Sequence, residues 1–139
     1  MEHEAGNLLH RLSVAIPNLR QPVAALSGGQ RQSIAVARAT LGHPKLVILD
    51  EPTAALGVTQ TREVLDLVRR LRDDGLAVVV ISHNLVDVFA VADRMVVLRL
   101  GRRVASFDAA TTTAEEVVAA ITGTRTEDVH STFVTEAPA

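Results

Sequence analysis

The sequence has 139 residues, a formal net charge of −2 and no cysteine. This length suits one ordinary domain, and a charged fraction of 22% is normal for a soluble globular protein. The charge balance argues against a nucleic-acid binder, which would carry a basic patch, and the lack of cysteine excludes disulfide and thiolate chemistry. No apolar run approaches the ~18 residues of a membrane span, so a soluble, cytoplasmic protein is expected.

The N-terminal third is predicted to be helical with one interruption. In residues 1–25, leucines at helical spacing precede Pro17 and Pro22, which indicates a short helix followed by a loop. Ser27 is a good N-cap, and a second helix is expected over residues 28–41. A glycine and a proline after this helix act as a stop signal.

From residue 46 onward, short apolar runs alternate with amphipathic ones. Continuous apolar runs of this kind are typical of strands buried on both faces of a parallel sheet. Asn84 and Asp87 are placed as a capping pair for one helix, and Thr113 and Glu116 for another. The alternation predicts an α/β fold with a mostly parallel sheet and flanking helices. The expected strands are 46–50, 77–82, 95–98 and an antiparallel 103–107, and the expected helices are 58–74, 84–92 and one between Thr113 and Gly123.

The segment Leu26–Gln32 places two glycines at a helix start. First-turn amides are unpaired and the helix dipole favours negative charge, so Ser27, Gly28, Gly29 and Gln30 form a candidate anion site. The glycines would let a phosphate approach the backbone closely. Taken alone, the same residues also fit an ordinary capped helix. An aspartate in place of Gly29 is expected to repel a phosphate and to leave the fold unchanged.

Two acids, Asp50 and Glu51, stand at the end of the first apolar strand, and His83 follows the second. The carboxyl ends of parallel strands form the edge at which α/β proteins bind ligands. These side chains are therefore candidates for metal binding and for acid–base chemistry. The alternatives are a solvated Asp-Glu-Pro turn and a surface histidine that caps a helix.

In this order and spacing, the three motifs resemble the signature, Walker B and switch-histidine motifs of ABC-type ATPases. The chain is similar to the C-terminal half of an ABC transporter ATP-binding protein, over about residues 1–126. The segments Glu51–Val58, Leu98–Arg103 and Ile121–Gly123 are similar to one subgroup, the sugar importers of the ribose/xylose type. Gly57 departs from the pattern, because most members carry an aspartate there for contacts across a dimer.

The resemblance implies roles in ATP hydrolysis. Asp50 would hold Mg²⁺, Glu51 would act as general base toward the attacking water, and His83 would contact the γ-phosphate. In this family two ATPase subunits dimerise head to tail around two ATP molecules, and the signature motif of one subunit, here Ser27–Gln30, meets the nucleotide of the other. The implied partners are a second ATPase subunit and a membrane permease, with no nucleic acid. The implied location is the cytoplasmic side of the cell membrane.

The 139 residues contain no phosphate loop of the form G-x-x-x-x-G-K-[ST]. The single lysine, Lys45, follows Pro44 and leads into the first apolar strand. The expected organisation is the end of a helical subdomain with a linker over 1–25, the C-terminal part of an ABC ATPase domain over 26–123 and a loose polar tail over 124–139. The fold is thus expected to be a partial P-loop NTPase fold that lacks the Walker A strand and loop.

In the family's sheet, the strand that leads into the phosphate loop lies between the strands expected here at 77–82 and 95–98. Without it, these two strands either close up on each other or leave open apolar edges. Two functions stay open at this point. One is a truncated ATP-binding subunit of a carbohydrate importer, inactive as a lone chain. The other is a non-catalytic interaction module that supplies the signature motif to a partner ATPase chain.

Overall fold

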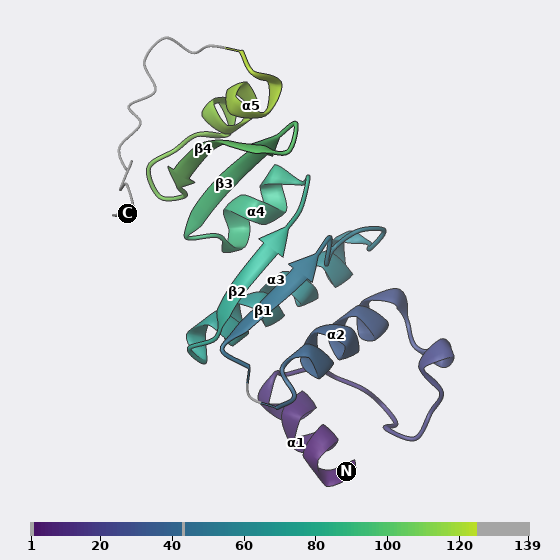
Figure 1. Cartoon of the computed structure of the whole chain (residues 1–139). Helices are drawn as coiled ribbons and strands as arrows, with labels where there is room; N and C mark the ends of the chain where they lie inside the picture. The colour runs from purple at the N-terminus through teal and green to yellow at the C-terminus, as the bar shows by residue number, and fades with distance from the viewer. Residues whose placement is uncertain (1, 43, 125–139) are drawn as a thin grey trace. The chain divides into compact units, whose positions relative to one another are not determined.

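The computed structural model describes residues 2–42 and 44–124, so the predicted tail lies, apart from its first residue, outside the described part of the chain. The described elements form two compact units, an N-terminal unit that ends at Val91 and a C-terminal unit that begins at Ala92. In chain order they are α1 (Glu2–Arg11), the 3₁₀ turn η1 (Val23–Ala25), α2 (Gly28–Ala39), β1 (Leu46–Asp50), α3 (Val58–Asp73), β2 (Ala77–Ile81), α4 (Leu85–Val91), β3 (Arg94–Arg99), β4 (Arg102–Asp108) and α5 (Ala114–Thr122) (Figure 1).

The N-terminal unit is built on a parallel pair of strands. Leu46 of β1 lies beside Ala77 of β2, and Asp50 at the end of β1 lies beside Ile81 at the end of β2. The crossover between the strands is α3, as expected for a parallel pair. The predicted α/β architecture with flanking helices is confirmed, and the carboxyl ends of both strands reach the same edge.

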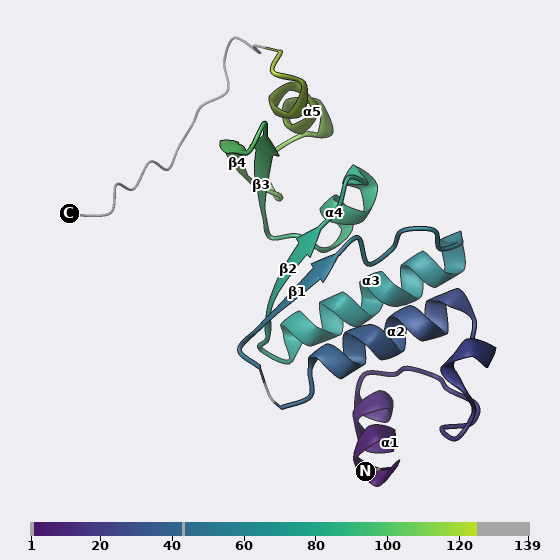
Figure 2. The same cartoon turned by 45° about the vertical axis from the view of Figure 1, so that its right-hand side comes forward.

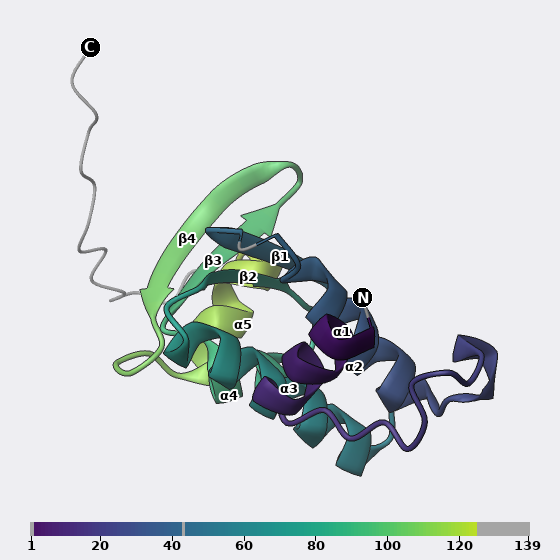
Figure 3. The ribbon, with the colours of Figure 1, turned by 90° about the horizontal axis from the view of Figure 1, so that it is seen from below.

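Within the described residues of this unit, helices cover one face of the β1–β2 pair. Val47 and Leu49 are buried in a core shared with α2 and α3. Leu46 and Ile48, which alternate with them along β1, are exposed. Figures 2 and 3 show α2 and α3 side by side on the same side of the two strands. The expectation that these strands are buried on both faces is therefore wrong for this chain, because no described element of the unit packs on the other face.

Helix α3 contributes several buried apolar side chains to this core. Val64, Leu67, Val68 and Leu71 lie on one stripe of the helix and are all buried. Gly75 ends the helix at a φ of +85°, a conformation that glycine adopts without steric cost. None of the described helices is long and apolar enough to cross a membrane.

The C-terminal unit is an antiparallel hairpin covered by one helix. The turn between β3 and β4 places Leu100 and Gly101 at positive φ, as in the tight turns whose twist matches that of a hairpin. Met95 and Val97 of β3 are buried, as is Val117 of α5. Among the described residues, β2 and β3 belong to different two-stranded sheets, one in each unit.

The capping pair predicted for α4 is half formed. Asn84 Oδ1 accepts a hydrogen bond from the Val86 amide at 3.0 Å, which is the expected turn at a helix start. Asp87 does not complete the pair. Its Oδ2 instead accepts a 2.6 Å hydrogen bond from the Thr53 hydroxyl, in a loop 34 residues earlier. A buried hydroxyl needs a partner, and Asp87 is the acceptor within reach.

Leu49→Ala and Ile48→Ala, two neighbours in β1, should differ sharply in their effect on stability. Leu49 is 7% exposed, so its truncation should lower the free energy of unfolding by about 2–5 kcal/mol through lost burial and a residual cavity. Ile48 is 62% exposed, and its truncation should cost about 1 kcal/mol or less. Urea denaturation followed by circular dichroism measures both changes. Equal losses would contradict a core on one face of the sheet.

Candidate functional site

Glu51 and His83 meet just past the ends of β1 and β2. The Glu51 amide donates to the Ile81 carbonyl oxygen at 2.8 Å, which continues the strand pairing by one residue. Glu51 Oε1 accepts two hydrogen bonds from His83, one from its amide at 3.2 Å and one from Nδ1 at 2.8 Å. Because both bonds fall on Oε1, His83 does not use the second carboxylate oxygen, Oε2. The sequence placed these two residues at one sheet edge, and the structure brings them into direct contact.

The loop after β1 turns sharply at Glu51. Glu51 has a φ of +46° and Ala55 a φ of +58°, both in the left-handed region that residues other than glycine rarely adopt. Local turns close the loop, since the Ala54 amide donates to the Glu51 carbonyl at 3.1 Å and the Leu56 amide to the Thr53 carbonyl at 3.3 Å. Such backbone positions cost about 1–3 kcal/mol each and persist where the surroundings hold them. The strain therefore falls on a residue of the candidate site.

The contact with Glu51 raises the pKa of His83. The main cause is the hydrogen bond to the carboxylate, and attraction between the two charges adds to it. Because an ionised carboxylate only accepts hydrogen bonds, Nδ1 must be the donor in this contact. The neutral imidazole therefore carries its proton on Nδ1, and Nε2 gains a proton only when the ring becomes an imidazolium.

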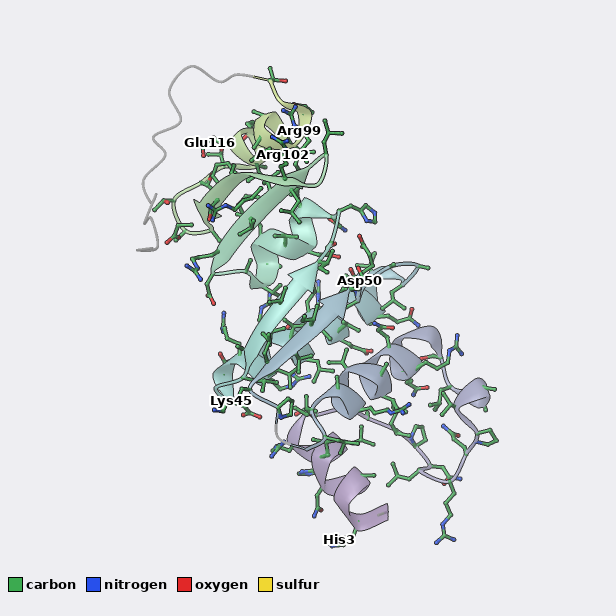
Figure 4. All side chains as sticks on the ribbon, in the orientation of Figure 1. His3, Lys45, Asp50, Arg99, Arg102 and Glu116 are labelled. Carbon is green, nitrogen blue, oxygen red and sulfur yellow. The ribbon has the colours of Figure 1, made fainter. Side chains whose placement is uncertain are left out.

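Asp50 ends β1 on the exposed face of the sheet. It follows Leu46 and Ile48 in the alternating pattern and is itself exposed. In the described ranges, no group of three or more His, Cys, Asp or Glu side chains is arranged to hold a metal ion. A single exposed carboxylate still fits Mg²⁺, which proteins bind through one or two carboxylates together with substrate phosphates. Figure 4 shows Asp50 and Lys45 near opposite ends of β1, so this lysine lies away from the acids.

The start of α2 has the predicted cap. Ser27 Oγ accepts from the Gln30 amide at 3.2 Å, and Gln30 Oε1 accepts from the Ser27 amide at 3.0 Å. This reciprocal pair satisfies two of the unpaired donors of the helix start. Figures 1 and 2 show that α2 begins at the end of the N-terminal unit where β1 and β2 finish. The role of these residues in anion binding stays a prediction, since the cap alone fits both interpretations.

Gly29 is buried against α3 rather than open to solvent. A Cβ atom at this position would lie 2.8 Å from Cγ and 2.9 Å from Cβ of Gln60, in the first turn of α3. Gln60 is itself held there, because its Oε1 accepts from the Gly57 amide at 3.1 Å. The expectation that an aspartate at position 29 leaves the fold unchanged is therefore wrong. Sequence reasoning missed this packing because nothing in the local pattern marks Gln60 as a neighbour of Gly29.

The candidate residues resemble those of known proteins over most of the chain. A family model described as ABC transporter matches residues 1–54. The fructose import ATP-binding protein of Rhizobium meliloti is 48% identical over 126 residues, which cover 90% of this chain and 48% of that protein. The xylose/arabinose import ATP-binding protein of Sulfolobus acidocaldarius is 43% identical over 122 residues, which cover 88% of this chain and 49% of that protein. The chain thus spans about half the length of these curated relatives.

Solved structures agree with this likeness. An inward-facing metal-chelate type ABC transporter has a TM-score of 0.74 and 30% sequence identity, with 87% of this chain and 48% of that chain covered. A dimeric ATP-binding cassette in a post-hydrolysis state with ADP and Pi has a TM-score of 0.65 and 27% identity, with 77% and 46% covered.

Glu51→Gln should lower the pKa of His83 toward its ordinary value of about 6.5, because it removes the negative charge that favours the imidazolium. NMR titration of the imidazole measures the change, and Glu63→Gln, an exposed site on α3, is the matched control. By linkage, the pairing contributes stability that is complete below the unfolded-state pKa and is lost as the pH rises through the higher folded-state pKa. An identical titration in both variants would contradict the contact.

Gly29→Ala should lower the free energy of unfolding by about 1–3 kcal/mol, the usual cost of overpacking, because the added methyl group overlaps Gln60. Gly28→Ala is the matched control, since its Cβ would make an ordinary 3.5 Å contact with Leu56 Cδ2. Urea denaturation compares the two variants. If both were equally stable, close packing would not be the reason for a glycine at position 29.

Proposed function

We propose that this chain carries part of an ABC transporter ATPase domain and forms the C-terminal half of an ATP-hydrolysing subunit that drives uptake of a sugar. The observation that supports this most directly is the contact between Glu51 and His83 at the shared edge of β1 and β2. The carboxyl edge of a parallel sheet is where α/β folds bind ligands, so this contact supports an acid–base role for the two residues. The relatives are import ATP-binding proteins, which supports the same function.

Glu51 is proposed as the general base. His83 engages Oε1 through two bonds, which fixes the carboxylate, while Oε2 remains able to accept a proton from an attacking water. An ordered carboxylate costs less reorganisation at the moment of reaction than a mobile one. The base is thus oriented before any substrate arrives.

His83 is proposed to hold Glu51 through Nδ1 and to face the transferred phosphate through Nε2. With Nδ1 donating to Glu51, Nε2 donates a hydrogen bond only in the imidazolium form. Glu51 favours that form by raising the pKa of His83. The pair therefore has two linked functions, since the base that accepts the proton of water also keeps the histidine able to donate to phosphate.

Asp50 is the residue proposed to hold Mg²⁺. As an exposed carboxylate at the end of β1, it lies at the same sheet edge as Glu51 without sharing that side chain's contacts. When bound there with ATP, Mg²⁺ would supply positive charge that neutralises the charge developing on the phosphate. Ser27, Gly28, Gly29 and Gln30 are proposed to meet the nucleotide of a second ATPase subunit. Their first-turn amides suit a phosphate.

The exposed face of the β1–β2 pair is proposed to pack against the other half of the cassette. This face presents Leu46, Ile48, Val79 and Ile81, which are 44–62% exposed. The relatives are about twice as long as this chain, so they contain enough additional chain to cover it. Burying such a face is favourable at about 25 cal/mol per Å² of apolar surface.

The proposed subunit acts at the cytoplasmic side of the cell membrane with a permease and a second ATPase subunit. The curated relatives import fructose, xylose or arabinose, and ribose, according to their names. Their shared chemistry is that of a small monosaccharide, and the proposal is made for that class. The solved relatives include a dimeric cassette, which supports a dimer of ATPase subunits.

The test is complementation of this chain with the N-terminal half of the fructose import relative, by fusion or co-expression. The complemented protein should hydrolyse ATP, and Glu51→Gln should reduce the rate by about 100-fold or more, since general base catalysis contributes about 10²–10⁴. Asp50 is left in place, so binding of ATP should persist. ATPase assays and titration calorimetry measure both effects.

Glu63→Gln is the control, because it makes the same chemical change on the exposed side of α3. It should leave hydrolysis unchanged, and the 139-residue chain alone should show no turnover. Full hydrolysis by the Glu51→Gln variant would overturn the assignment of the base. A complemented protein that binds no ATP would overturn the proposed function.

A further inference from the structure

A buried hydrogen bond joins the loop that follows Glu51 to the helix that follows His83. The hydroxyl of Thr53 donates to Asp87 Oδ2 at 2.6 Å, and the two residues are 8% and 6% exposed. A hydroxyl-to-carboxylate bond of this length is a strong, charge-assisted one. Thr53 and Asp87 are 34 residues apart in the chain, so this is a tertiary contact between two segments rather than a feature of either.

Each partner of this bond lies a few residues along the chain from one member of the Glu51–His83 pair. Thr53 lies two residues after Glu51, and its own carbonyl accepts from the Leu56 amide in the same loop. Asp87 lies four residues after His83, in the first turn of α4. A displacement of Asp87 would therefore shift the start of α4 and the residues that lead into it. The Thr53–Asp87 bond spans the same two segments as the Glu51–His83 contact.

Polar contacts hold both ends of helix α4. It has seven residues, far fewer than an isolated helix needs for stability, and Asp87 and Val91 are its buried residues. Arg69 of α3 donates through Nε and Nη2 to the Ala90 carbonyl at 3.2 and 2.8 Å, which holds the end of the helix. The Thr53–Asp87 bond holds the beginning. Without it, the side of α4 nearest His83 loses its buried polar attachment.

The strained backbone at Glu51 gives this attachment a consequence for the site. A non-glycine residue at a φ of +46° remains there only if its surroundings hold it. Pro52 and Thr53, the next two residues, are both buried, and Thr53 provides the hydrogen bond that fixes them to α4. If the bond is lost, the loop is free to relax at Glu51, and the carboxylate moves away from His83.

We propose that Thr53 and Asp87 are positioning residues, and that their hydrogen bond holds the Glu51 carboxylate against His83. Their role in hydrolysis rests on the proposed function, but the geometry that they maintain is measurable in the chain without nucleotide. If Thr53 served only to stabilise the fold, its substitution would lower the free energy of unfolding. The contact between Glu51 and His83 in the folded state would stay unchanged.

The experiment compares Thr53→Val, which removes the hydroxyl with little change in shape, with Thr53→Ser, which keeps it. Thr40→Val is the matched control, because the Thr40 hydroxyl is equally buried and donates to the Ala37 carbonyl at 2.7 Å, at the far end of α2. NMR titration of His83 is measured in each folded variant. The resonance is identified as the one that His83→Gln removes.

Thr53→Val should move the His83 titration to lower pH, by about half or more of the shift produced by Glu51→Gln, because Glu51 no longer stays in contact. Thr53→Ser and Thr40→Val should leave the titration at the parent value. In the complemented protein, Thr53→Val should lower kcat for ATP about 10-fold or more with little change in KM, since a small misplacement of a reacting group is costly.

Three results would overturn the proposal. One is a His83 titration that Glu51→Gln moves but Thr53→Val leaves unchanged. This result would contradict the positioning role and leave the proposed role of Glu51 in place. Another is that the Thr53→Val variant unfolds while the Thr40→Val variant stays folded. The Thr53–Asp87 bond would then stabilise the whole N-terminal unit rather than position Glu51. The third is a Thr53→Ser titration that matches Thr53→Val. If Glu51→Gln itself leaves His83 unchanged, the proposed function fails together with the positioning role.

Discussion

The parallel register of β1 and β2 is the constraint on which the candidate site depends. It aligns Asp50 with Ile81, so that the next amide, that of Glu51, donates to the Ile81 carbonyl. His83 then follows β2 by two residues and reaches the Glu51 carboxylate with both its amide and its ring. Register is strongly specified in a sheet with one buried face. A slip of one residue would turn Val47 and Leu49 to the exposed face and Ile48 to the packed face. The apolar pattern of β1 thus fixes the position of the acids at its end.

Tertiary contacts then hold what the register has placed. Gln60 fills the space beside Gly29, so the start of α2 packs on the first turn of α3. Arg69 binds the carbonyl of Ala90 and keeps α4 on α3. Thr53 and Asp87, by contrast, are buried polar groups, which are costly unless paired, so their bond favours one arrangement of the segments that it joins. The strained conformation at Glu51 persists inside this set of contacts.

Sequence patterns predicted the features that arise from near neighbours. The reciprocal caps of Ser27 with Gln30 and of Thr113 with Glu116 form as expected, because both partners lie within one helical turn. The antiparallel strand expected at 103–107 is of the same local kind, because a tight turn joins it to the strand before it. The pairing of Asp87 with Thr53 was not predicted, since a local capping role for Asp87 explained the sequence equally well. The one-sided burial of β1 was also missed, because an apolar run does not show which face has a partner.

The exposed apolar face and the proposed metal ligand are connected by the alternation of β1. Leu46, Ile48 and Asp50 point to the same face of the strand, and Asp50 is the residue nearest the edge where Glu51 lies. A segment that covers Leu46 and Ile48 and continues along the strand would therefore reach Asp50. The acid–base pair needs no such segment, since Glu51 and His83 are held by contacts inside this chain. Such packing would bring the other half of the cassette to the carboxylate proposed to hold Mg²⁺, next to the proposed base, which His83 already orients.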